Sequence, residues 1–104
     1  MRSQRFQALV AQQPDNVMFR FSLAQALVEE NCPADAIPHL EFCARARADW
    51  MMARILWGKA LVATGQPDAA RPILAEALAL AVAQEHETPE AEVRALLDDL
   101  SSRG

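Results

Sequence analysis

The chain has 104 residues, 52% of them hydrophobic, and a formal net charge of −4. This length and composition predict one all-α domain over residues 1–104, because a chain of this size buries a single core and its abundant alanine favours helices. The acidic balance and the scattered basic residues exclude a typical nucleic-acid-binding domain, which carries clustered Lys and Arg.

Hydropathy and composition also indicate where in the cell the protein is located. No stretch approaches eighteen apolar residues without a charge, and the apolar patch near the N-terminus is too short for the core of a signal peptide. We therefore expect a cytoplasmic protein that does not bind membranes. Nine arginines against one lysine, together with the abundant alanine, are typical of a bacterial protein from a GC-rich genome.

The first helix is predicted near residues 3–13. It carries the apolar residues Phe6 and Leu9, and Pro14 ends it because proline cannot continue a helix. Phe6 and Leu9 have the register of apolar residues in the second helix of the repeat described next. Residues 3–14 are therefore predicted to form an N-terminal half repeat.

Residues 17–50 and 51–84 repeat each other without gaps. Nine of the thirty-four positions are identical, whereas chance would give roughly three, and a fixed period of this kind indicates a stacked supersecondary unit. The identical pairs are Met18/Met52, Arg20/Arg54, Ala26/Ala60, Leu27/Leu61, Val28/Val62, Pro33/Pro67, Ala36/Ala70, Pro38/Pro72 and Leu40/Leu74.

The residues that begin and end helices repeat as well. Asn31 and Gly65 occupy equivalent positions of the two repeats, and both residue types readily adopt the left-handed conformation that closes a helix. Asp15 and Asp49 are also at equivalent positions, and we expect each to be the N-cap of the helix that follows. The prolines at 33 and 67 suit a first helical turn, so each unit is predicted to be helix, tight turn, helix.

Apolar stripes at helical spacing predict the core. The first helices carry Leu23, Ala24 and Leu27, then Trp57, Gly58 and Leu61; the second helices carry Ala36, Leu40 and Cys43, then Ala70, Leu74 and Ala77. Small residues among large ones predict close approach of the helix backbones.

The second prolines of the two units, Pro38 and Pro72, lie about one turn into their helices, where proline removes an N–H bond. Either a kink in each helix or a later start of each helix explains these prolines, and the sequence does not choose between the two.

The last helix is predicted over residues 88–101 as a C-terminal cap of the stack. Thr88 is its expected N-cap, with Pro89 at the first helical position. Its single apolar stripe contains Val93, Leu96, Leu97 and Leu100. A one-sided terminal helix closes the exposed end of a repeat stack. Together the predicted helices lie near residues 3–13, 16–30, 33–47, 50–64, 67–85 and 89–101.

The repeat resembles the tetratricopeptide repeat (TPR) family, whose pattern is W-x2-L-G-x2-Y, then A-x3-F, then P. Here it reads R-x2-L-A-x2-L from Arg20 and R-x2-W-G-x2-L from Arg54, followed in each unit by A-x3-L. Arginine replaces the expected Trp, and Ala48 replaces the proline between units. The resemblance implies a TPR-like right-handed solenoid of about six helices in antiparallel helix–turn–helix repeats.

Members of this family generally bind proteins, so the resemblance implies a non-catalytic module that holds a peptide or helix of a partner protein in an apolar concave groove. The first helices of the repeats would line it. The groove residues carried over are Met18, Phe21, Gln25, Val28, Met52, Ile55, Lys59 and Val62. Alternatively, the same face packs against the C-terminal leucines or against a second copy in a homodimer.

The sequence does not indicate a disulfide, a metal site or a catalytic site. Cys32 and Cys43 are expected to be reduced, since helical rise separates them by roughly 15 Å and a disulfide needs about 7 Å or less between Cα atoms. His39 and Cys43 lie four apart on one helix, but no second pair completes a metal site. No nucleophile has a paired His and no Gly-rich phosphate loop occurs. We expect no enzyme activity, cofactor or metal.

Overall fold

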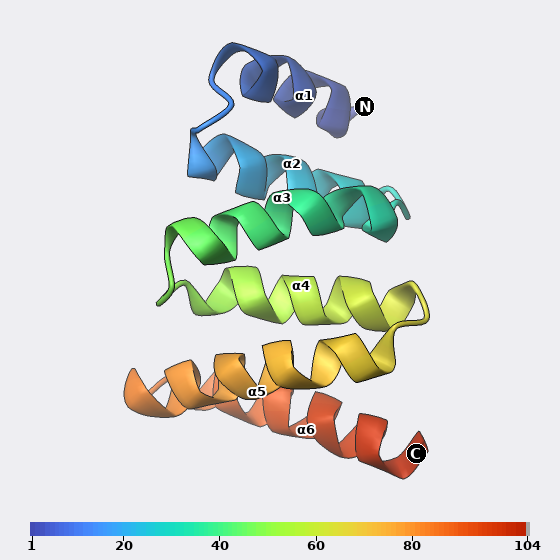
Figure 1. The fold of residues 1–104 in the computed structure, drawn as a ribbon, viewed down its shortest axis with the longest axis vertical. Helices are drawn as coiled ribbons and strands as arrows, with labels where there is room; N and C mark the ends of the chain where they lie inside the picture. Colours follow the sequence, from blue (N-terminus) through green and yellow to red (C-terminus); the bar gives the residue numbers. More distant parts are fainter. Residues whose placement is uncertain (104) are drawn as a thin grey trace.

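The computed structural model describes residues 1–103 and contains six helices and no strand within them. The helices are α1 (Arg2–Gln12), α2 (Val17–Glu29), α3 (Pro33–Ala46), α4 (Met51–Ala63), α5 (Pro67–Ala83) and α6 (Glu87–Arg103). Consecutive helices run antiparallel and stack along the longest axis, with the termini at opposite ends (Figure 1). The predicted all-α fold is confirmed, and helix bounds differ from prediction by at most two residues.

Most residues of the predicted apolar stripes form the core, in two clusters, and Trp57, Leu96 and Leu97 are half-buried beside them. The first lies around Leu23 and Leu40, between α2 and α3, and extends to α4. The second lies around Leu74, between α4 and α5, and extends to Val93 and Leu100 of α6. The second-helix positions predicted from both repeats are fully buried: Ala36, Leu40, Cys43, Ala70, Leu74 and Ala77.

Three of the turns share one backbone geometry. Asn31 and Gly65 have φ of 63° and 77°, as predicted, and Glu85 before α6 has φ of 57°. In the first turn the amide of Cys32 donates to the carbonyl oxygen of Leu27 at 2.7 Å, and the other two turns repeat this bond. The bond and the left-handed residue satisfy the last carbonyls of the helix. The third instance was not predicted, because Glu is not a typical left-handed residue.

The predicted N-caps of α2 and α4 were wrong. Asn16, not Asp15, caps α2, because its side-chain oxygen accepts from the amide of Phe19 at 3.1 Å. Trp50 occupies the same position before α4 and makes no side-chain cap bond, so Asp49 is not the cap either.

The predicted start of α6 was also wrong. The helix begins at Glu87, which makes Thr88 a helical residue and Pro89 the third position rather than the first. Pro89 is compatible with this place because the first amides of a helix have no partner within it.

Pro38 and Pro72 lie inside helices that begin at Pro33 and Pro67, which excludes the late helix start. Each proline deprives the carbonyl four residues earlier of its helical donor. Those carbonyls belong to Ala34 and to Asp68, and both residues are exposed. Water can therefore replace the lost hydrogen bond.

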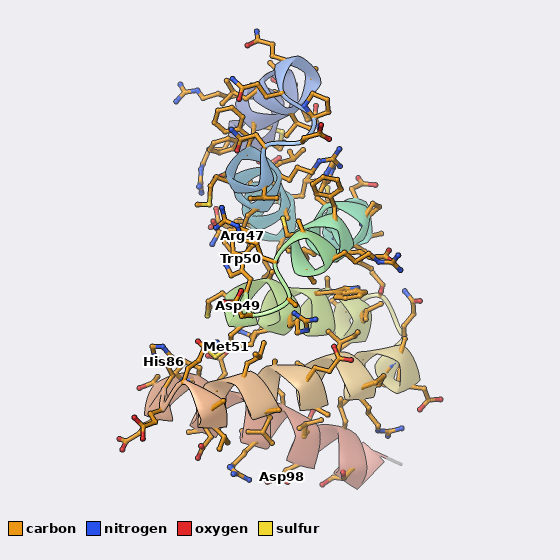
Figure 2. The ribbon with its side chains drawn as sticks, turned by 60° about the vertical axis from the view of Figure 1, so that its left-hand side comes forward. Arg47, Asp49, Trp50, Met51, His86 and Asp98 are labelled. Carbon is orange, nitrogen blue, oxygen red and sulfur yellow. The ribbon has the colours of Figure 1, made fainter. Side chains whose placement is uncertain are left out.

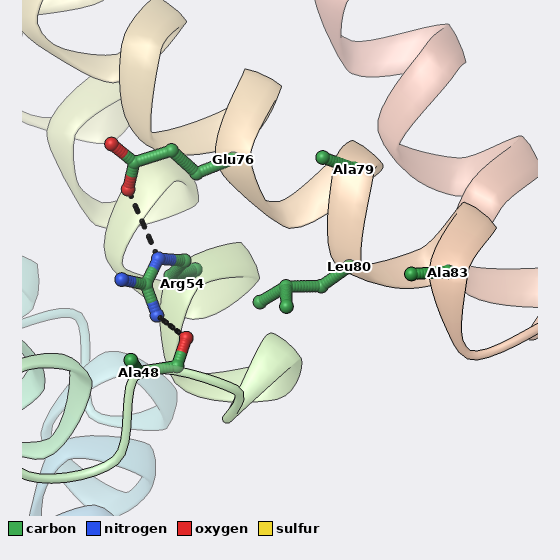
Figure 3. A pocket seen from close by; sticks show the side chains of 6 residues that line it. All are labelled: Ala48, Arg54, Glu76, Ala79, Leu80 and Ala83. Carbon is green, nitrogen blue, oxygen red and sulfur yellow. Dashed lines mark hydrogen bonds and ion pairs between the residues drawn. The ribbon is translucent and has the colours of Figure 1, made fainter.

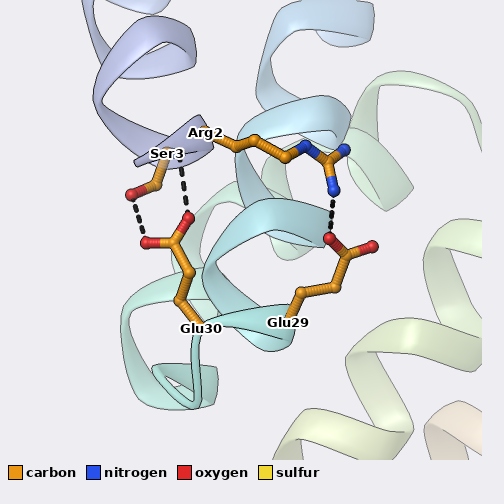
Figure 4. A network of polar contacts seen from close by, with 4 residues as sticks. All are labelled: Arg2, Ser3, Glu29 and Glu30. Carbon is orange, nitrogen blue, oxygen red and sulfur yellow. Dashed lines mark hydrogen bonds and ion pairs between the residues drawn. The ribbon is translucent and has the colours of Figure 1, made fainter.

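A carboxylate of the α2–α3 turn holds the N-terminus of α1. Glu30 accepts from the Ser3 amide at 3.0 Å and from the Ser3 hydroxyl at 2.6 Å, and Arg2 pairs with Glu29 beside it (Figure 4). A negative charge is favourable at the positive end of a helix, where amides lack partners. Ser3 is buried, so this contact fixes the first helix on the stack.

Candidate partner-binding surface

The predicted groove residues have different environments in the structure. Met18, Gln25, Met52 and Lys59 are exposed; Phe21, Val28 and Val62 are half-buried; Ile55 is buried. They come from α2 and α4, which run parallel because each is antiparallel to α3 between them (Figure 1). The two helices do not present one continuous apolar groove of eight residues.

Ile55 is not a groove residue, and this part of the prediction was wrong. Its side chain is 1% exposed and belongs to the same buried cluster as Val93 and Leu100 of α6. Val62 packs against that cluster too. Ile55 and Val62 of α4 therefore pack in or against a core cluster that also includes residues of α6.

Lys59 is engaged by the same helix. Its ammonium group forms an ion pair with the Glu92 carboxylate, which joins α4 to α6. Both side chains are more than a third exposed, so water screens the pair and its contribution to stability is small. Lys59 is nevertheless not a free cation for an acidic ligand.

Phe21 is covered by an aromatic residue that the sequence analysis did not select. The rings of Phe21 and Trp50 have centroids 4.8 Å apart and are tilted by 34°. On Trp50 the guanidinium of Arg47 lies 5.4 Å from the ring centroid, and Arg47 and Trp50 appear together beside the α3–α4 turn in Figure 2. A signal was present in the sequence, since a Trp replaces Asn16 at the repeat-equivalent cap position.

Two methionines remain open on this face. Met18 is 51% exposed and Met52 is 47% exposed. Each is the second residue of its helix, at equivalent positions of the two repeats. With the Phe21–Trp50 pair, they define what we call the methionine face: Met18, Phe21, Trp50 and Met52. The flexible, polarisable side chain of Met adapts to irregular apolar partners.

His39 and Cys43 each contact another group of the protein. The thiol of Cys43 is fully buried and donates to the carbonyl oxygen of Val17 at 3.5 Å, and burial raises its pKa to about 11. His39 Nδ1 lies 3.4 Å from a guanidinium nitrogen of Arg20. Partial burial, and then the charge of Arg20, lower the pKa of His39. Both residues are explained by packing.

Comparison with known proteins supports the fold. No protein-family model matches the sequence, and no curated protein matches it. The solution structure of protein BPP2914 from Bordetella parapertussis is similar, with a TM-score of 0.83 and 26% sequence identity over 99% of this chain and 90% of that one. The helical arrangement is thus shared over almost the whole chain.

None of the helices within residues 1–103 combines the length and the hydropathy that a transmembrane segment needs.

Proposed function

We propose that this chain is a TPR-like, non-catalytic interaction module that binds an apolar peptide or helix of a partner protein on the methionine face. The observation that carries the proposal is the exposure of Met18 and Met52, 51% and 47%, at equivalent positions of parallel helices. Exposed single apolar residues are common on protein surfaces. A pair repeated with the period of the fold, with Met18 three residues before Phe21 and Met52 two residues after Trp50, fits a docking surface better.

The TPR assignment rests on the sequence pattern and on the arrangement of helices. The leucine and small-residue positions of the pattern, such as Leu23 and Ala24, are buried between the helices of a pair. The arginines that replace the family's Trp make a repeated contact of their own. Arg20 donates to the carbonyl oxygen of Pro14 and Arg54 to that of Ala48, each at 2.6 Å, so both hold the turn before their helix.

The ligand should be mainly apolar. Lys59 is paired with Glu92, and the exposed polar neighbours of the face are Gln25 and Arg47, whose guanidinium lies over the Trp50 ring. Methionine and aromatic side chains would contact apolar anchors spaced along one side of a helix or an extended peptide. Binding should therefore weaken little as the salt concentration rises, because salt screens charges rather than apolar contacts.

Capture from extracts of the source cell tests this proposal. The wild-type protein is compared with a Met18→Glu, Met52→Glu double variant and with an Ala8→Glu, Ala11→Glu control, which makes the same charge change at exposed positions of α1. Circular dichroism checks that all three fold. A partner retained by wild type and control, lost from the methionine variant and bound again after purification supports the proposal. Equal retention by all three places binding elsewhere.

Sedimentation at several concentrations addresses the alternative, a structural module that forms a homodimer through the same face. A concentration-dependent dimer that the Met18→Glu, Met52→Glu variant cannot form would favour self-association. A monomer at all concentrations would favour a different protein as the ligand.

A further inference from the structure

An open hollow of about 390 Å³ lies outside the methionine face, between the α3–α4 turn and the C-terminal half of α5 (Figure 3). Its lining residues are Ala48, Arg54, Glu76, Ala79, Leu80 and Ala83. Apart from Arg54 and Glu76, these side chains are alanines and one leucine. The hollow is therefore an apolar site with one ion pair in its wall.

Arg54 is held in place within this wall. Its guanidinium donates to the carbonyl oxygen of Ala48 at 2.6 Å and to the carboxylate of Glu76 at 3.0 Å. The Arg54 side chain is only 15% exposed, whereas that of Glu76 is 56% exposed. A planar cation fixed by two partners is a preorganised surface on which a ring can stack.

The equivalent arginine of the first repeat, Arg20, already has an aromatic ring stacked on it. Arg20 donates to the carbonyl oxygen of Pro14 at 2.6 Å, as Arg54 does to that of Ala48. The guanidinium carbon of Arg20 lies 4.1 Å from the centroid of the Phe42 ring. Phe42 stands thirty-four residues before Glu76, at the equivalent position of α3.

The second repeat lacks this ring. Glu76 replaces Phe42, and Ala79 and Ala83 stand at the positions that Arg45 and Asp49 occupy in the first repeat. Four of the six lining residues have side chains no larger than that of leucine, three of them alanines. The ring that covers Arg20 in the first repeat is thus missing in the second, where Arg54 lies beside a hollow lined mainly by small side chains.

We propose that this hollow is a docking site for one aromatic side chain of a partner peptide, which stacks on Arg54 as Phe42 stacks on Arg20. The charges favour a neutral ring over an anion, because Glu76 already balances Arg54. A ring face is attracted to the guanidinium, and the positive ring edge suits the carboxylate beside it. A Trp or Tyr can also donate a hydrogen bond to Glu76.

This site is independent of the proposed function on the methionine face. None of its lining residues belongs to that face or to the predicted groove, and it uses α5 where the groove uses α2. Failure of one site in experiment would leave the other untouched.

Chemical-shift mapping with small probes tests the proposal. The ¹⁵N-labelled protein is titrated with N-acetyl-tryptophanamide and, separately, with N-acetyl-leucinamide. We expect saturable shifts of the amides of Glu76, Ala79 and Ala83, with about fivefold weaker binding of the leucine probe, which lacks the attraction between ring and cation. Equal binding of both probes, or shifts confined to other residues, would overturn the proposal.

Two variants that close the hollow complete the test. Glu76→Phe restores the ring of the first repeat, and Ala79→Phe fills the hollow from α5. Each folded variant should lose the tryptophan-probe shifts, while Glu87→Phe, at an exposed position of α6, should keep them. If either variant folds and still binds the tryptophan probe as the wild type does, the proposed site beside Arg54 is contradicted. Ala79→Phe provides the test if Glu76→Phe does not fold.

Discussion

Gly58 of α4 faces Leu74 of α5 so closely that the two helices leave no room for a methyl group. A Cβ atom added at Gly58 would lie 2.4 Å from Leu74 Cδ2 and 2.6 Å from Leu74 Cγ. Leu74 is fully buried and cannot turn away into solvent. The glycine of the repeat is therefore required by packing, and its backbone angles are those of an ordinary helix.

Gly58→Ala should destabilise the protein although alanine is the better helix former. The gain in helix propensity is about 1 kcal/mol, whereas overpacking a filled core costs about 1–3 kcal/mol. The expected result is a lower free energy of unfolding in urea. A Leu74→Ala change, made in the wild type and in the Gly58→Ala variant, provides the control, since it should cost less in the variant. A stabilised Gly58→Ala protein would show that the helices are farther apart.

Acid should weaken the contact that holds α1. The Ser3 hydroxyl, then the Ser3 amide, lower the pKa of Glu30 below its ordinary value of 4.5. A carboxyl with a lowered pKa in the folded state stabilises the protein above the ordinary value, and this stabilisation is lost as pH falls through the lowered one. Wild type should be more stable than Ser3→Ala at pH 7, and the difference should shrink below pH 4.5. Urea unfolding at several pH values measures it, and a pH-independent difference would contradict the role of Glu30.

His39 should give a second, separate pH dependence. Burial, followed by the charge of Arg20, lowers its pKa, and Asp35 acts in the opposite direction. The folded state therefore resists protonation, so stability falls as pH drops below the ordinary value of 6.5. Between about pH 7.5 and about pH 5 the wild type should lose more stability than a His39→Gln variant. Equal losses would mean that the ring is neither buried nor held beside Arg20.

The C-terminal helix should be held by its apolar side chains rather than by its ion pair. Leu100 is buried in the second core cluster, so Leu100→Ala should cost about 2–5 kcal/mol. Glu92→Ala removes the partly exposed partner of Lys59 and should cost less than about 1 kcal/mol. Denaturant unfolding of both variants tests the comparison. If Glu92→Ala lowers the free energy of unfolding more than Leu100→Ala does, the ion pair rather than the apolar contacts holds α6.

Period and composition predicted the parts of the fold that both repeats share. Ala36 and Ala70 are fully buried, and Asn31 and Gly65 have the expected left-handed backbone. Such positions could be predicted because one local geometry requires the same residue type twice.

Features that depend on a single position were predicted less well. Asp15 was predicted to cap α2 because Asp49 is its equivalent in the second repeat, but Asn16 is the cap. Sequence patterns locate a helix end only to within one or two residues, which is enough to select the wrong cap. Ile55 was assigned to the groove because helical spacing shows which face a residue occupies, but not which other helix covers that face. Trp50 lies in a turn, where helical spacing gives no information.

Methionine-methyl NMR spectroscopy tests most directly whether a partner binds the methionine face. The protein contains four methionines, so a sample labelled with ¹³C at the methionine methyl groups gives a simple spectrum. Met51 is buried beside Met52 in sequence and serves as an internal control. On addition of the purified partner, we predict that the Met18 and Met52 signals shift together in a saturable manner and that the Met51 signal changes little. Saturable binding that leaves the Met18 and Met52 signals in place would contradict the account.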